Sequence, residues 1–181
     1  MKVLLTIDLS AGKWANGLFQ NTFFFAKMLL SMGYDVAFLV HHPLKKCKFS
    51  CEDIPVFRIK DVLNFTNIDV LFQTSWIASD NVVRKILSKN KNCKNIHIHY
   101  GNKMIGDIEE IKNKKKISCT PFMVDEVWMS PHFEFSMQYY ETYYGCPIKV
   151  CPYIWSSEFI DKEEKLANRA NRTMHHDPEK E

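Results

Sequence analysis

Apolar residues recur along this chain in two alternating patterns. Short apolar runs that end in a polar residue, such as Lys2–Asp8 and Tyr34–His42, are typical of buried strands. Longer apolar or amphipathic segments, such as Leu18–Met32 and Asp80–Lys89, are typical of helices. Strands that alternate with helices in this way indicate a parallel sheet with helices on both faces. We therefore predict an α/β, Rossmann-like three-layer domain with a mostly parallel sheet.

The remaining segments continue the same alternation. Further strands are predicted at Val56–Ile59, Ile68–Thr74, Asn95–Tyr100, Glu126–Met129 and Ile148–Cys151. A short turn or helix is expected at Val62–Phe65, and one helix from Pro131 to Tyr144, with proline in its first turn and Gly145 after its end. Residues 161–181 are charged and poor in large apolar side chains, so we expect one domain over residues 1–160 followed by a charged helical or disordered tail.

The composition excludes several classes of protein. A formal net charge of +3 is too small to indicate nucleic-acid binding. No segment has the pattern of a signal peptide or a membrane span, because the best candidate, Leu18–Met32, is interrupted by polar residues. The six cysteines show no common zinc spacing, and we expect them to be reduced. These features predict a cytoplasmic protein that needs no metal or other cofactor.

Polar and aromatic side chains follow the predicted strands. The carboxyl ends of parallel strands meet at one edge of a sheet, which is where such sheets bind ligands. We single out five residues at this edge: Trp76, Tyr100, Asn102, His132 and Glu134. Indole, phenol, amide and imidazole groups suit neutral polyols such as sugars better than phosphates, since arginines are few. The same rule places further residues at this edge; they are Asp8, Ser10, Lys13, His41, His42, Gln73, Thr74, Ser75, His99, Gly101, Ser130, Tyr153 and Trp155.

Two roles are open for His132 and Glu134. Either side chain can act as a general base or bind a hydroxyl group. In the structural alternative, Ser130 caps the helix and Glu134 interacts with the helix dipole. His97 and His99 alternate with isoleucines and so share one face of a strand, as a core pair or as metal ligands.

The start of the first predicted helix is the second candidate region. Trp14, Asn16 and Gly17 lie in the loop before it, and Gln20 and Asn21 lie in its first turns. A glycine at a helix start lets backbone N–H groups approach a ligand. The glycine spacing matches neither the dinucleotide nor the P-loop motif, which argues against both. Structurally, Asn16 would cap the helix, Gly17 would relieve crowding, and the two amides would bond a neighbouring loop.

Several short strings resemble a known family in their order and spacing. They are Ile7-Asp8 with Trp14–Asn21, then Tyr100–Asn102, Val127–Glu134 and Pro152–Trp155. Together, over roughly residues 2–160, they resemble the N-terminal half of two-domain, GT-B-like glycosyltransferases of bacteria and large DNA viruses. The resemblance implies a domain that binds the acceptor and faces, across a cleft, a second domain that binds the nucleotide sugar.

The resemblance also implies roles for particular residues. The residues that it places at the cleft, with access to the donor phosphates, are Asn16, Gly17, Gln20 and Asn21, and near the cleft His132 and Glu134. Since the chain ends where the second domain would begin, we expect an acceptor-side domain that is incomplete as a catalyst alone. Its expected partners are a sugar or glycan acceptor and, through the second domain, a nucleotide sugar. The alternative is a non-catalytic Rossmann-like binding or scaffold module.

Overall fold

A computed structural model gives the fold of the chain and describes residues 1–10, 17–41, 54–62, 64–99, 108–110, 112–113 and 123–152. The strands are β1 (Lys2–Thr6), β2 (Asp35–Val40), β3 (Val56–Arg58), β4 (Val70–Gln73), β5 (Lys94–His99), β6 (Glu126–Met129) and β7 (Ile148–Val150). They form one seven-stranded sheet in the order β3-β2-β1-β4-β5-β6-β7. Each of its six pairings is parallel, which confirms the predicted α/β, Rossmann-like sheet.

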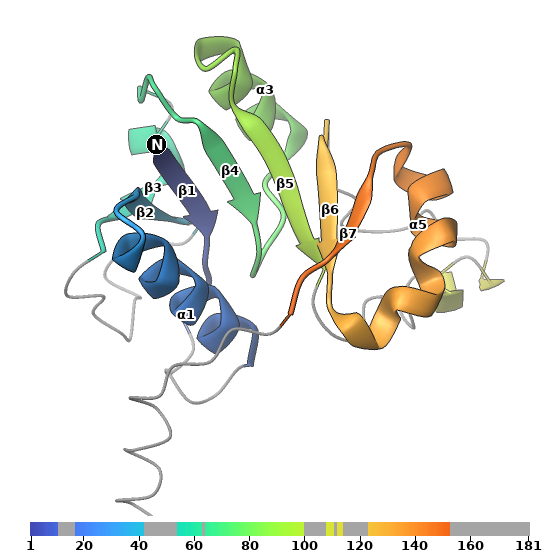
Figure 1. Cartoon of the computed structure of the whole chain (residues 1–181). Helices are drawn as coiled ribbons and strands as arrows, with labels where there is room; N and C mark the ends of the chain where they lie inside the picture. The colour runs from blue at the N-terminus through green and yellow to red at the C-terminus, as the bar shows by residue number, and fades with distance from the viewer. Residues whose placement is uncertain are drawn as a thin grey trace, which may run out of the picture.

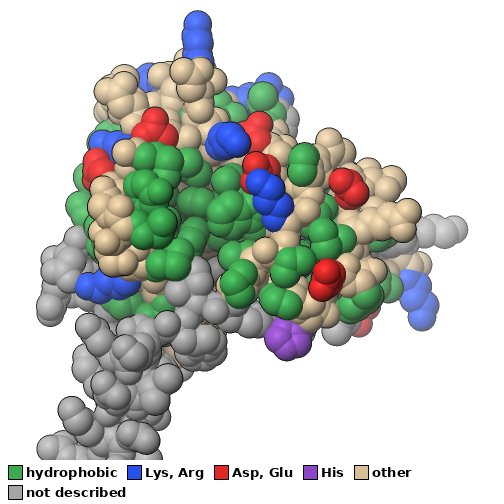
Figure 2. Space-filling model, in the orientation of Figure 1, with side chains coloured by type: hydrophobic (Ala, Val, Ile, Leu, Met, Phe, Trp, Pro, Cys, Tyr) green, Lys and Arg blue, Asp and Glu red, His purple; other side chains and the backbone are tan. Residues whose placement is uncertain are grey.

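Helices cover the sheet on both faces (Figure 1). They are α1 (Gly17–Ser31), α2 (Ile59–Val62), α3 (Asp80–Lys89), the 3₁₀ helix η2 (Pro131–Ser136) and α5 (Met137–Tyr144). Helix α1 packs on one face through Phe25, Ala26 and Leu29, within a single apolar cluster that also contains Val3 and Phe72. Figure 2 shows hydrophobic side chains gathered on this side of the molecule.

The opposite face carries two separate apolar clusters. One joins β1, β2 and β4 to α3, and includes Leu4, Leu71 and Ile86. The other joins β6 and β7 to α5, and includes Met129 and Tyr140. Apolar clusters on both faces make the sheet the middle of three layers.

The strand order reverses between β1 and β4. The chain runs from β1 outward to β2 and β3, then returns to lay β4 against the other side of β1. In sheets of this kind, the crevice outside the carboxyl ends of the two central strands is the usual ligand site. The fold thus directs attention to the residues that follow β1 and β4.

Two details of the local structure differ from the sequence prediction. Helix α2 ends at Val62, where the prediction for Val62–Phe65 began. The helix predicted over Pro131–Tyr144 consists of the 3₁₀ helix η2 followed by α5. The predicted glycine after the second of these helices is confirmed as its C-cap, because Gly145 has a φ value of +65°, which glycine adopts readily. Gly33, two residues after α1, likewise has a φ value of +83°.

Two further predictions concern the limits of the domain. The expected boundary near residue 160 lies outside the described residues and stays a prediction. Among the helices that the structure describes, none is long and apolar enough to cross a membrane.

Candidate functional site

Hydroxyl groups tie the carboxyl ends of β1 and β4 together. The backbone N–H of Thr74 donates to Thr6 Oγ1 (2.8 Å), and that hydroxyl donates to the carbonyl oxygen of Trp76 (2.7 Å). The Thr74 hydroxyl donates to the carbonyl oxygen of Thr6, and Ser75 N–H donates to the same oxygen (3.3 Å). Thr6 and Thr74 are both buried. These bonds fix the backbone at the point where the strand order reverses.

Helix α1 is joined to the same point by a pair of hydroxyls. Thr22, which is fully buried, places its Oγ1 3.1 Å from Ser75 Oγ and donates to the carbonyl oxygen of Leu18 (2.8 Å). Thr22 and Ser75 are 53 positions apart in the sequence. The first turns of α1 are therefore held beside the end of β4.

A carboxylate follows β1 at this edge. Asp8 Oδ1 accepts hydrogen bonds from the backbone N–H (2.9 Å) and the hydroxyl (2.6 Å) of Ser10. The turn leaves Asp8 half-buried and Ser10 exposed. We call Asp8, Ser10, Thr22 and Ser75 the switch-point site. Thr22 is fully buried and positions Ser75, whereas the Ser10 and Ser75 hydroxyls and the Asp8 carboxylate can donate to or accept from the hydroxyl groups of a neutral ligand.

Trp76 borders the switch-point site on the β2 side. Its Nε1 donates to the carbonyl oxygens of Ile7 (3.2 Å) and Leu39 (3.3 Å), just beyond β1 and within β2. The ring of His41 lies edge-to-face against the indole, with 5.2 Å between the ring centroids. The indole N–H of Trp76 is thus bonded to main-chain oxygens. The ring of His41, an exposed residue, continues the aromatic surface beside the indole.

The start of α1 places the predicted residues as follows. Gly17 is the first residue of α1 and is exposed, while Gln20 and Asn21 are half-buried. The Asn21 side chain donates to the carbonyl oxygen of Gly17 (2.9 Å), so the neighbouring-loop bond considered for it is replaced by one within α1. A Cβ added at Gly17 would meet no described heavy atom within 4 Å, so the idea that this glycine relieves crowding is wrong.

His132 and Glu134 lie at the same edge but further along the sheet. Both are exposed residues of η2, which follows β6 directly. Two strand spacings separate β4 from β6, which amounts to about 10 Å. Ser130 occupies the N-cap position with a buried side chain that makes no capping bond, so the predicted capping is wrong. A ligand that reaches both His132 and the switch-point site must span this separation.

The structure brings part of the predicted set together. Gly17, Gln20 and Asn21 lie in the first turns of α1, the helix whose Thr22 contacts Ser75, and Trp76 follows Ser75 directly. His132 and Glu134 instead follow β6, two strands away from β4. Trp14, Asn16, Tyr100 and Asn102 lie outside the described residues and stay predictions.

Sequence reasoning placed Asp8, Ser10 and Ser75 at this edge without selecting them, and it missed Thr22. The position of a polar residue directly after a strand was the available signal for the first three. A buried threonine within an apolar helix, as in Thr22, was a signal for the fourth.

His97, His99 and the described cysteines are not part of the switch-point site, whereas His41 contacts Trp76 at its border. The prediction that His97 and His99 share a face is confirmed, since both are buried on the α5 side of the sheet, with 4.8 Å between the ring centroids of His99 and Tyr140. Burial raises the pKa of Cys93 to about 12, and it also raises the pKa of Cys146 and Cys151. Across the described residues, no group of three His, Cys, Asp or Glu side chains has a metal-binding arrangement.

Comparison with protein families gives one match, which covers nearly all of the described sheet. The family described as "Protein of unknown function (DUF2827)" matches residues 4–181. The chain belongs to the DUF2827 family. In this DUF2827 chain, the match includes every residue of the switch-point site together with His132 and Glu134. No protein with a curated description matches the chain.

Proposed function

We propose that this chain is the acceptor-side domain of a GT-B-like glycosyltransferase, which transfers a sugar from a nucleotide-sugar donor held by a second domain. The main support is the edge where the strand order reverses, at which the Thr22 and Ser75 hydroxyls lie 3.1 Å apart and the Asp8 carboxylate accepts from Ser10. The Ser10 and Ser75 hydroxyls, which are not fully buried, and the Asp8 carboxylate suit a neutral polyol. The resemblance of the sequence strings to that family supplies the reaction class.

Each part of the switch-point site has a role in this proposal. Ser75 and Ser10 bind hydroxyl groups of the acceptor sugar. Asp8, His132 and Glu134 are the candidate general bases, because a sugar hydroxyl must lose a proton as it attacks the donor. Asp8 is the candidate closest to the other binding groups, whereas His132 and Glu134 serve an acceptor that extends toward β6. No metal is required in this proposal.

A titration followed by ¹H–¹⁵N NMR tests whether this domain binds the acceptor sugar and leaves the nucleotide sugar to the second domain. Maltotriose and N-acetylglucosamine serve as acceptor probes, and UDP-glucose and GDP-mannose as donor probes. We expect the sugars to shift the amide signals of Asp8, Ser10 and Ser75, and the nucleotide sugars to shift them little. Tight binding of either nucleotide sugar to this chain alone contradicts an acceptor-side role, and an absence of shifts with all four probes contradicts the proposed function.

A pair of serine variants makes the test specific. Ser75→Ala removes a hydroxyl from the switch-point site, and its loss is expected to weaken sugar binding about 2- to 10-fold, the value of one ordinary hydrogen bond. Ser88→Ala is the control, because Ser88 is an exposed residue of α3 whose hydroxyl bonds only locally, to the carbonyl oxygen of Lys85. Equal binding by the two variants would remove Ser75 from the site.

Two observations favour a second candidate, a non-catalytic Rossmann-like binding or scaffold module. The amide of Asn21 and the indole N–H of Trp76 both bond to the main chain, so these two predicted ligand groups have structural roles. A binding module would give the same sugar-induced shifts in the titration. The two candidate functions differ in an assay of sugar transfer by the complete gene product. If this domain is a non-catalytic module, Asp8→Asn would transfer sugar at the wild-type level.

A further inference from the structure

Helix α5 carries two pairs of tyrosines on different faces. Tyr140 and Tyr144 face the sheet, where Tyr140 is fully buried against His99 and Tyr144 lies near His97. Tyr139 and Tyr143 face outward, with exposed fractions of 42% and 39%. Sequence neighbours on a helix point in directions about 100° apart, which explains why each adjacent pair is divided between core and surface.

The outward rings are held in place by the inward ones. Tyr139 lies edge-to-face against Tyr140, and Tyr143 against Tyr144, each with 5.1 Å between ring centroids. As a result, Tyr139 and Tyr143 stand nearly parallel, with an angle of 9° between their planes and 6.3 Å between their centroids. Edge-to-face contacts with buried rings restrict the motion of exposed side chains. The outer pair is therefore ordered before any ligand binds.

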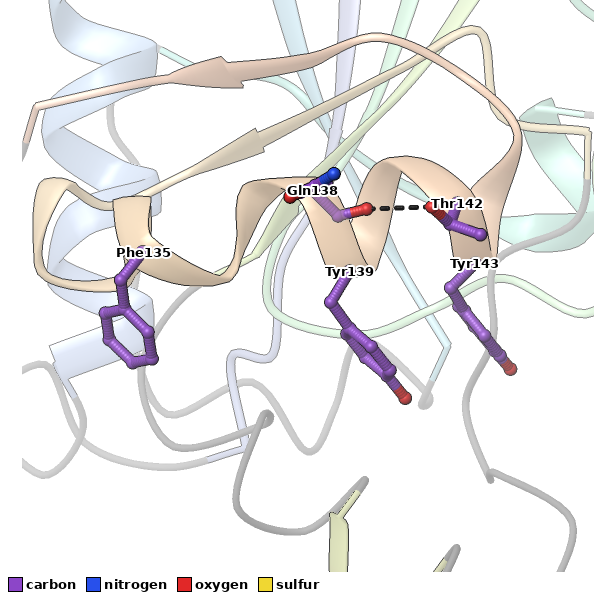
Figure 3. Close-up of a pocket in the computed structure, with 5 residues that line it drawn as sticks. All are labelled: Phe135, Gln138, Tyr139, Thr142 and Tyr143. Carbon is purple, nitrogen blue, oxygen red and sulfur yellow. Dashed lines mark hydrogen bonds between the residues drawn. The ribbon is translucent and has the colours of Figure 1, made fainter.

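Phe135 extends this surface toward the end of β6. It lies in η2, four residues before Tyr139. Its side chain is 75% exposed, more than that of either outward tyrosine. The rings of Phe135, Tyr139 and Tyr143, together with Gln138 and Thr142, line a depression of about 760 Å³. Figure 3 shows the two tyrosines projecting side by side from α5, with Phe135 further along toward η2. We call these five residues the aromatic groove.

The chemistry of the aromatic groove selects for one kind of ligand. Among the described residues that line it, none carries a charge. It nevertheless contains two phenol hydroxyls, an amide and the Thr142 hydroxyl, which donates to the carbonyl oxygen of Gln138 (2.9 Å) and can still accept a bond. Ring faces beside neutral hydrogen-bonding groups suit a ligand that has both apolar C–H faces and many hydroxyls. The volume lies within the range of small-molecule sites.

From these features we infer that the aromatic groove binds an oligosaccharide. Sugar rings present C–H groups that pack on Tyr139, Tyr143 and Phe135, while their hydroxyls bond to Gln138 and the tyrosine hydroxyls. The groove extends along α5, which gives room for more than one sugar unit. The inference goes beyond the proposed function and does not depend on it, since a glycan can bind here without being a substrate at the switch-point site.

An NMR titration with maltohexaose and with cellohexaose tests the inference. Binding is expected to shift the amide signals of Phe135, Gln138, Tyr139 and Tyr143, and to saturate. Replacing Tyr143 by alanine removes one ring and is expected to weaken binding about 2- to 10-fold, as judged from the usual contribution of an aromatic contact. Tyr143→Phe keeps the ring and loses one hydroxyl, so its affinity should lie between that of the wild type and that of Tyr143→Ala. Met32→Ala, at another exposed apolar residue, serves as the control and should bind normally.

Each other outcome of the titration overturns the inference. Absence of shifts in the groove with both hexasaccharides excludes the oligosaccharide. Shifts confined to Asp8, Ser10 and Ser75 would support the proposed function and remove the groove from it. Sedimentation velocity provides an independent measurement: self-association that Tyr143→Ala abolishes, without sugar binding, would make the groove an interface between copies of the chain. If Tyr143→Ala fails to fold, Phe135→Ala replaces it, since Phe135 is largely exposed.

Discussion

The two faces of the sheet are built differently. On the α1 face, apolar side chains from six adjacent strands, all but β7, form one continuous cluster, with Phe72 in edge-to-face contact with both Phe25 (4.9 Å) and Trp128 (5.2 Å between centroids). On the opposite face, apolar contacts divide into two clusters. The buried polar residues of β4 and β5 on this face are Gln73, Asn95, His97 and His99.

The polar residues on that second face are connected to one another. Gln73 Nε2 donates to Asn95 Oδ1 (2.9 Å), and Gln73 Oε1 accepts from the backbone N–H of Ala78 (2.9 Å). Asn95 Nδ2 donates to the carbonyl oxygen of Met123 (3.0 Å), and His97 Nδ1 lies 3.2 Å from the carbonyl oxygen of Gln73. Apolar packing tolerates several arrangements, whereas directional bonds specify one. The α1 face thus carries the largest apolar cluster. The bonded residues Gln73, Asn95 and His97, which we call the polar seam, fix the position of the connecting segments at Ala78 and Met123.

The largest expected effect comes from a cavity in the α1 face. Phe72→Ala removes a buried ring from the centre of the continuous cluster and should lower the free energy of unfolding by about 3–5 kcal/mol. Urea denaturation followed by circular dichroism measures this change. Phe135→Ala is the matched control, because Phe135 is 75% exposed and its loss should change stability by less than about 0.5 kcal/mol. Similar losses in the two variants would contradict the assignment of the main core to this face.

The sequence predicted the sheet because the strands carry strong local patterns. In β5 the alternation of Ile96 and Ile98 with His97 and His99 announced two different faces, and the structure places them so. The helix over Pro131–Tyr144 was predicted as a single element because a proline stands in its first turn and Gly145 follows its end. The change from 3₁₀ to α geometry near Ser136 depends on packing and on a local bond from Ser136 Oγ to the carbonyl oxygen of Phe133 (2.7 Å).

The candidate site was less predictable than the sheet. A general rule predicts that the carboxyl ends of parallel strands meet at one edge, but it does not give the order of the strands. The sequence therefore identified the edge but not the two strands at its centre. The contact between Thr22 and Ser75 joins residues 53 positions apart, and no local pattern encodes it. The indole of Trp76 was expected to meet a ligand, yet its N–H bonds to the main chain of two neighbouring segments, which only the folded arrangement reveals.

An intermediate effect is expected from the polar seam. Asn95→Ala removes the bonds that Asn95 makes to Gln73 Nε2 and to the carbonyl oxygen of Met123. This loss should lower the free energy of unfolding by about 1–3 kcal/mol. Its control is Asn81→Ala, at an exposed position of α3. Amide hydrogen exchange adds a second readout, since exchange should increase around Met123 and Asp125 more than in β1. Uniform acceleration across the sheet would show that the seam has no separate positioning role.

The smallest expected effect tests the charged edge of the α1 face. Glu126 accepts from Trp128 Nε1 (2.9 Å), and its carboxylate lies 2.9 Å from Lys149 Nζ and 3.5 Å from Lys94 Nζ. The hydrogen bond from Trp128, followed by the one from Lys149, lowers the pKa of Glu126. Because the pKa is lower in the folded than in the unfolded chain, the stabilisation is complete above the ordinary glutamate value of about 4.3 and is lost as pH falls through the folded-state value.

Glu126→Gln should therefore reduce stability at pH 7 by less than about 1 kcal/mol, since both lysines are more than half exposed. Urea denaturation at pH 7.0, 5.0 and 3.5 (conditions chosen to bracket about 4.3) should show the gap between wild type and variant closing at the lowest value. Glu141→Gln, at an exposed carboxylate of α5, should show no such closing gap. A loss at pH 7 as large as that of Phe72→Ala would mean that the α1 face depends on its charged edge as much as on its apolar centre, and the contrast between the two faces would no longer hold.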